Sequence, residues 1–145
     1  MKKIISVVAI MLFVFASCDH GNIIGGRYFG TFHNQTNGLR EAGSLSFKYY
    51  NEEGAIYFMM NDILSMSQMA ENKFSGMAEG SQLEDLLKTM PAIDSIQVCD
   101  SLSTIEYMTV ETEFMGNSVK TNMTFTTLND TTEKMVDVEF IGSFE

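Results

Sequence analysis

This chain of 145 residues has no tryptophan, one proline, two cysteines and two histidines. Basic side chains are also scarce, with 9 Lys and Arg against 19 Asp and Glu and a formal net charge of −10 at pH 7. Such an acidic chain is a poor partner for nucleic acid, whose binding depends on Lys and Arg that neutralise phosphates. Because no histidine cluster exists, zinc and facial-triad iron sites are not expected. The sequence thus predicts no metal, no cofactor and no nucleic-acid partner.

A long uncharged apolar run follows two lysines at the N-terminus and extends from residue 4 to residue 15. A membrane-spanning helix needs roughly 20 apolar residues, and this run is shorter. Small residues and a cysteine follow it, as at the cleavage point of an export signal. The segment Phe15-Ala16-Ser17-Cys18 resembles the lipobox of bacterial lipoproteins. We therefore expect a lipoprotein signal peptide over residues 1–17, the alternative being a secretory signal with a structural Cys18.

Cys18 is the predicted lipidation site, because its thiol is the nucleophile that takes diacylglycerol as a thioether. Two or three acyl chains, such as palmitate, hold a protein durably on a bilayer. Loss of the two signal-peptide lysines changes the formal net charge from −10 to −12, so the lipid and not a basic patch must provide the attachment. Residues 18–26 include three glycines and predict a flexible tether. The mature protein is expected in the cell envelope, with the outer membrane favoured over the inner.

Beyond the tether, apolar and polar residues alternate in short segments, which is typical of half-buried antiparallel strands. Turn signals separate the later segments at Gly116-Asn117 and at Asn129-Asp130. Residues 27–145 therefore predict a single, mainly β domain, built as a small antiparallel barrel or sandwich. The expected strand segments are 28–32, 44–49, 55–60, 93–99, 104–115, 119–127 and 136–140.

One helix is expected near residues 81–90. Ser81 with Glu84 three residues on has the spacing of a capping box, and Pro91 would end the helix. The stretch 62–80 before it is ambiguous between helix and strand. A single apolar face should close one end or one side of the sheet. That face consists of Leu83, Leu86, Leu87 and Met90.

Large apolar side chains on the expected strands are candidates for the lining of an internal ligand cavity. The same residues fit a fully packed core equally well, because small barrels are commonly filled by their own side chains. The candidate lining residues are Tyr28, Phe32, Phe47, Tyr49, Phe58, Met60, Met123 and Phe125.

Catalytic groups are few, and no catalytic residue is assigned. Glu111 and Glu113 share one face of an expected strand and could serve as the two carboxylates of a glycosidase, although a solvated acidic surface explains them as well. Cys99 and His33 are the residue types of a cysteine nucleophile and its base, but the sequence around them has no signature of a known nucleophile site. We expect His33 on a strand surface and Cys99 as a small buried side chain.

Two sets of residues offer metal ligands, and each set also has a structural explanation. Asp130 and Glu133 could ligate calcium, but their spacing matches no EF-hand loop and a turn explains them. Met66 and Met69 could bind Cu(I) through soft thioethers. Core filling by a flexible side chain is the preferred interpretation of the many methionines, since no His or Cys lies nearby in sequence.

The lipobox, the glycine-containing tether and the opening strand Gly26-Arg27-Tyr28-Phe29-Gly30-Thr31-Phe32 resemble the small calycin-like lipoproteins of unknown function found in Gram-negative bacteria. The resemblance covers the N-terminal third best. It implies an antiparallel, barrel-like fold after the lipidated cysteine and brings no catalytic residues. Three Asp-Ser/Thr triplets look like O-glycosylation sites of exported proteins in such bacteria, which makes Ser95, Ser101 and Thr131 candidate glycosylation sites.

The function expected from these features is that of a membrane-anchored, non-enzymatic binding or accessory lipoprotein. Its partners would be the lipid bilayer, through acylated Cys18, and another envelope protein. The alternative is a lipocalin-like carrier of a small apolar ligand, and the third possibility is an acid/base hydrolase such as a glycosidase.

Overall fold

The computed structural model describes residues 25–100 and 103–145. The predicted signal peptide, the lipidation site Cys18 and the glycosylation candidate Ser101 lie outside the described residues. Within those residues, no helix has the length and apolar character that a membrane crossing requires.

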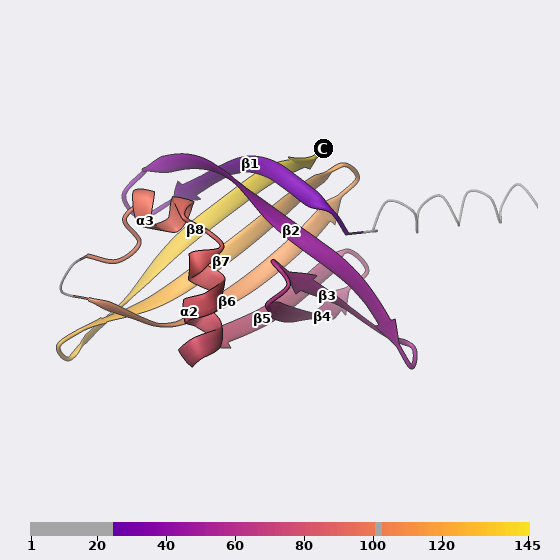
Figure 1. Cartoon of the computed structure of the whole chain (residues 1–145). Helices are drawn as coiled ribbons and strands as arrows, with labels where there is room; N and C mark the ends of the chain where they lie inside the picture. Colours follow the sequence, from indigo (N-terminus) through magenta and orange to yellow (C-terminus); the bar gives the residue numbers. More distant parts are fainter. Residues whose placement is uncertain (1–24, 101–102) are drawn as a thin grey trace, which may run out of the picture.

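Eight antiparallel strands form a closed barrel, in which each strand pairs with its neighbours in sequence and β1 also pairs with β8 (Figure 1). Closure leaves none of the eight as a free edge. The prediction of a mainly β, antiparallel fold is confirmed, and of the barrel and the sandwich the chain adopts the barrel. The strands are β1 (Arg27–Asn34), β2 (Arg40–Glu52), β3 (Ala55–Met60), β4 (Leu64–Ala70), β5 (Lys73–Glu79), β6 (Thr104–Met115), β7 (Ser118–Asn129) and β8 (Thr132–Phe144).

The two longest hairpins turn where the sequence predicts. Met115 pairs with Ser118 across β6 and β7, and Gly116 between them has a φ of 61°, which glycine adopts without steric penalty. Residues 129 and 132 pair across β7 and β8, and Asp130 in that turn has a φ of 53°. Asp tolerates this left-handed conformation better than most residues do. Tight turns therefore fix the register of β6, β7 and β8, which is interrupted only by a shift between Ile105 and Tyr107 of β6.

A row of three glycines crosses β2, β1 and β8, because Gly30 pairs with both Gly43 and Gly142. A Cβ atom on Gly30 would lie 1.9 Å from the carbonyl oxygen of Ile141, and one on Gly142 would lie 2.6 Å from the ring of Phe140. Side chains at these positions would therefore collide with backbone or with core rings. The glycine of the opening Tyr-x-Gly-Thr segment is needed for the close approach of β1 to β8.

Two helices, α2 (Gly80–Lys88) and α3 (Ala92–Ser95), lie between β5 and β6. The predicted capping box at Ser81 and Glu84 is wrong: the N-cap is Glu79, and it makes no side-chain capping bond. The reason is that β5 runs directly into the helix, with Glu79 still extended and Gly80 at a φ of 61° to turn the chain. The predicted C-terminal end of the helix is confirmed, since Thr89 caps the helix two residues before Pro91.

The strand predicted at residues 93–99 does not form. The chain instead makes α3 and an irregular segment in which Ile93, Ile96 and Val98 are all buried. Ile93 and Ile96 are three residues apart, the spacing that places both on one side of a helical turn. The ambiguous stretch 62–80 folds as β4 and β5, so its methionines follow strand and not helix periodicity.

Candidate functional site

The barrel interior is the first candidate site, and seven of the eight predicted lining residues do face it. Each of these seven has no more than 2% of its surface exposed, whereas Tyr49 is 39% exposed. Tyr49 has the inward-facing parity of β2, and its ring lies 5.5 Å from that of Phe58. It is exposed because β2 and β3 continue as a hairpin beyond the closed part of the barrel (Figure 1).

Aromatic rings pack the half of the interior nearest the start of β1 and the C-terminus. Phe114 lies at their centre, with ring centroids of Phe58 at 4.7 Å, Phe47 at 5.3 Å, Phe74 at 5.9 Å and Tyr28 at 6.1 Å. Centroid distances of 4.5–7 Å are those of rings in direct contact. Phe114 and Phe74 were not predicted to line the interior, although the alternation along β6 places Phe114 on the buried face. Side chains of the barrel itself therefore pack against one another in this half of the interior.

The other half of the interior is closed by the segment from α2 to Val98, which we call the end cap. Its apolar side chains insert into the barrel, and Leu86 and Ile96 are fully buried. Asn34 at the end of β1 donates a hydrogen bond from Nδ2 to the carbonyl oxygen of Ile96 at 3.0 Å, and Asn37 donates a second to the same oxygen at 3.0 Å. The prediction that one helix face closes an end of the sheet is confirmed.

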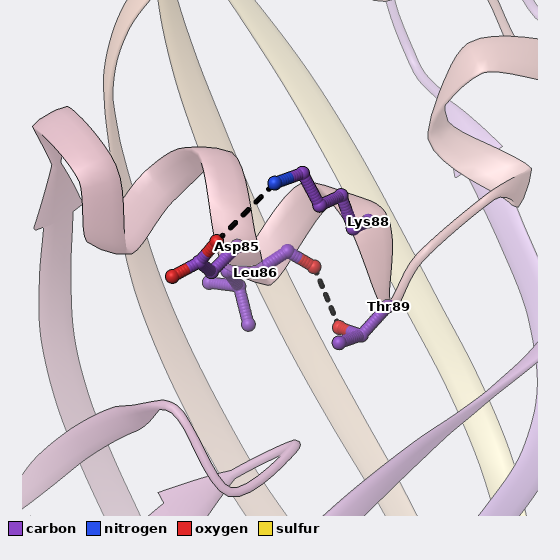
Figure 2. A network of polar contacts seen from close by, with 4 residues as sticks. All are labelled: Asp85, Leu86, Lys88 and Thr89. Atoms are coloured by element: carbon purple, nitrogen blue, oxygen red, sulfur yellow. Dashed lines mark hydrogen bonds and ion pairs between the residues drawn. The ribbon is translucent and has the colours of Figure 1, made fainter.

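A second set of hydrogen bonds holds the end cap to the turn between β3 and β4. Asn61 accepts a bond from the backbone N–H of Ser46 at 2.8 Å and donates from Nδ2 to Oγ1 of Thr89 at 2.9 Å. The Thr89 hydroxyl donates in turn to the carbonyl oxygen of Leu86 at 2.6 Å, near the exposed ion pair of Lys88 and Asp85 (Figure 2). The end cap is thus fixed on two sides of the barrel.

The interior also holds one buried polar pair. Oγ1 of Thr112 and Oγ1 of Thr121 lie 3.0 Å apart, and the Thr112 hydroxyl is 3.7 Å from the sulfur of Met66. Both threonines are fully buried, so each hydroxyl satisfies the other in place of water. Among the described residues, no buried side-chain nitrogen or oxygen lacks a partner.

The carboxylates proposed for a glycosidase face outward. Glu111 lines a shallow groove of about 500 Å³ over β5, β6 and β7, together with Met77 and Asn122. Glu113 is paired across the strands with Lys73 and Lys120. A glycosidase needs two carboxyl groups on either side of the scissile bond. Glu111 is the one carboxylate that lines this groove, so the arrangement does not fit that chemistry.

Cys99 and His33 do not form a nucleophile site. The Cys99 thiol donates to the carbonyl oxygen of Ser103 at 2.8 Å, and burial, with a smaller effect of Asp100, raises its pKa. An activated nucleophile needs the opposite shift. His33 is half-buried on β1, where it pairs with Arg40 and Glu139.

The metal hypotheses find no support in the geometry. Met66 is fully buried, whereas Met69 is 61% exposed, so the two thioethers do not share a site. Across the parts of the chain that the structure describes, no group of three or more His, Cys, Asp or Glu residues could hold a metal ion. Asp130 and its neighbours form the hairpin turn that was the alternative to a calcium site.

A stacked pair of tyrosines marks the outer face of the β2–β3 hairpin, and we call this surface the tyrosine face. The rings of Tyr50 and Tyr57 are nearly parallel, at an angle of 7° with centroids 5.0 Å apart. The ammonium of Lys48 lies 5.6 Å from the centroid of the Tyr50 ring. Tyr57 is hydrogen-bonded to Glu52, and burial, reinforced by this carboxylate, raises its pKa. Nothing in the sequence analysis singled out this pair.

The tyrosine face borders a shallow groove of about 420 Å³ between β3 and β4. Ser67 lies directly across from Tyr57 and leaves one side of that ring uncovered by a large neighbour. Ser65 and Gln68 supply further hydroxyl and amide groups along the groove. An aromatic wall beside polar groups is a composition typical of binding surfaces.

Two of the three glycosylation candidates can be placed. Ser95 is exposed at the end of α3, and Thr131 is exposed in the turn between β7 and β8. Both are at the end of the barrel that carries the end cap, opposite the start of β1 (Figure 1). Their accessibility is compatible with modification, which stays a prediction.

No protein-family model, curated protein or solved structure matches this chain. The resemblance to calycin-like lipoproteins therefore remains a prediction from the N-terminal residues, and function must be argued from the barrel itself.

Proposed function

We propose that this chain is a lipid-anchored, non-enzymatic binding module of the cell envelope that contacts another envelope protein through the outside of its barrel. The observation that carries the proposal is the occupied interior. Five aromatic rings in mutual contact around Phe114 fill one half, and the end cap fills the other. A carrier needs an enclosed apolar pocket large enough for most of its ligand's surface.

The tyrosine face is the part of the exterior best suited to a protein partner. Tyrosine presents a large, rigid contact area with a polar tip, and it is enriched at protein interfaces. Tyr50 and Tyr57 are held in place by mutual stacking and by Glu52, so little side-chain entropy remains to be lost on binding. The adjoining groove adds hydroxyl and amide groups for hydrogen bonds.

Site-specific photocrosslinking in intact cells tests this proposal. A photoreactive residue replaces Ser67, which is exposed beside Tyr57, and a matched residue replaces Asn122, which is exposed on the outer face of β7. We expect an adduct of discrete mass from position 67 that disappears in the Tyr57→Ala variant. Equal adducts from both positions, or none from position 67, would reject the tyrosine face.

Native mass spectrometry of the purified full chain addresses the carrier alternative. Because side chains pack the interior, we expect the measured mass to equal that of the acylated protein alone, with no bound small apolar molecule. A co-purified ligand that protects the interior against hydrogen exchange would favour a carrier. The same mass spectrum reports whether Cys18 carries its acyl chains.

A further inference from the structure

The end of the barrel opposite the end cap collects exposed apolar side chains, and we call this set the rim surface. Its members are Phe29, Met115, Ile141 and Phe144, which are 47%, 45%, 50% and 50% exposed. The side chains of Phe29 and Ile141 point outward from β1 and β8. Phe144 lies at the mouth of the barrel, where its ring is 5.6 Å from that of Tyr28.

The register places these residues at one end of the barrel, on strands that are distant in sequence. Met115 pairs with Ser118, Ser118 with Ser143, and Ser143 with Phe29. The outward-facing level that runs across β6, β7, β8 and β1 is therefore free of charge. Lys120, which forms an ion pair with Glu139 at 3.4 Å, lies one step further along the barrel, directly across from Ile141.

The described chain begins at the same end. The carbonyl oxygen of Gly26 accepts a hydrogen bond from the N–H of Phe47 at 2.9 Å, and the backbone N–H of Glu145 reaches the carbonyl oxygen of Arg27. The start of β1 and the C-terminus thus lie together, away from the end cap (Figure 1). A lipid anchor upstream of Gly25 would therefore hold this end of the barrel closest to the bilayer.

The length of chain before Gly25 limits how far this end can be from a lipidated Cys18. Six residues separate the two positions, and a fully extended chain spans at most about 3.5 Å per residue, so the limit is about 25 Å. A strand of 12 residues such as β7 measures about 40 Å along its axis. An upright barrel therefore keeps the rim surface near the bilayer and the end cap away from it.

We propose that the rim surface inserts into the interfacial layer of the bilayer to which Cys18 anchors the chain, so that the end cap, at the opposite end of the barrel, remains accessible to partners. This inference rests on the lipid anchor of the proposed function. Exposed aromatic and aliphatic side chains gain free energy at the membrane interface, and this gain requires no basic residues. A bilayer also suits a surface of four apolar side chains better than a stable protein partner, which needs a larger contact.

Spin-label depth measurements test the orientation with the full acylated chain in phosphatidylcholine vesicles. In a Cys99→Ser background, one nitroxide is placed at Ser143→Cys on the rim and another at Thr131→Cys in the β7–β8 turn. We expect the label at 143 to shift toward contact with oxygen, which concentrates in lipid, and to lose contact with a water-soluble nickel complex. The label at 131 should stay fully accessible to nickel.

Two serine variants provide the matched comparison. Phe29→Ser with Ile141→Ser should abolish the shift at position 143, whereas Met77→Ser with Met135→Ser, which alters exposed apolar residues elsewhere, should leave it intact. Equal nickel contact at 143 and 131 in vesicle-bound, acylated protein would overturn the orientation. A mass without acyl chains would instead reject the anchor, which keeps the two failures distinguishable.

Discussion

Replacing Phe114 with alanine tests whether the barrel interior is as full as the ring contacts indicate. Phe114 is 3% exposed, and four aromatic rings have centroids between 4.7 and 6.1 Å from its own. Truncation of a buried phenylalanine removes its transfer free energy and leaves a cavity, at a combined cost of about 3–5 kcal/mol. We expect a loss of this size, because rings packed on all sides cannot collapse into the gap. The Phe114→Leu variant keeps most of the volume and should lose only about 1 kcal/mol.

Urea unfolding followed by circular dichroism measures these losses, and the absence of tryptophan makes dichroism the better signal. The Phe114→Ala cavity is apolar, and cavities of that kind in other proteins stay dry and bind benzene. Benzene should therefore raise the stability of Phe114→Ala and leave the parent protein unchanged. A loss below about 1 kcal/mol with an unchanged denaturant slope would refute the reasoning, because it means that the interior already has spare room. That result would favour the carrier.

Two further predictions concern the buried threonine pair and the free cysteine. Thr112→Val leaves the buried Thr121 hydroxyl without its partner at 3.0 Å and should lower the free energy of unfolding by about 1–3 kcal/mol, whereas Thr112→Val with Thr121→Val should cost less than the single change. A double variant less stable than the single one, measured by the same urea unfolding, would contradict this account. For Cys99, burial raises the pKa, so iodoacetamide should alkylate it more slowly than a free thiol at pH 8, and the rate should still be rising at pH values where a free thiol has levelled off. Mass spectrometry measures the rate of alkylation. A rate at pH 8 as high as that of free cysteine would show that the thiol is not shielded.

The strand pattern was readable because half-buried antiparallel strands impose a period of two on the sequence. The predicted segments 55–60 and 104–115 coincide with β3 and β6, and the turns at Gly116 and Asp130 lie where their residue types indicate. The prediction failed at residues 93–99, because a short apolar segment that fills the mouth of a barrel is as hydrophobic as a strand. Periodicity alone does not separate the two.

The site was predictable only in part, for related reasons. Alternation placed Tyr28, Phe47 and Phe58 on the inner face, but it could not show that Phe114 comes from the far side of the ring to fill the space between them. The tyrosine face escaped detection because Tyr50 and Tyr57 lie on different strands, and their contact depends on the register of the hairpin.

The sequence by itself predicts the export signal and the lipidated Cys18, which are recognised as linear motifs, and it determined the alternation and the turns that specify an antiparallel sheet. Those are properties of neighbouring residues. Only the tertiary structure decided that β8 closes on β1, that Phe114 and the end cap occupy the interior, and that Phe29, Met115 and Phe144 lie at the end of the barrel where β1 begins. These features depend on contacts between residues separated by most of the chain, which no local pattern encodes.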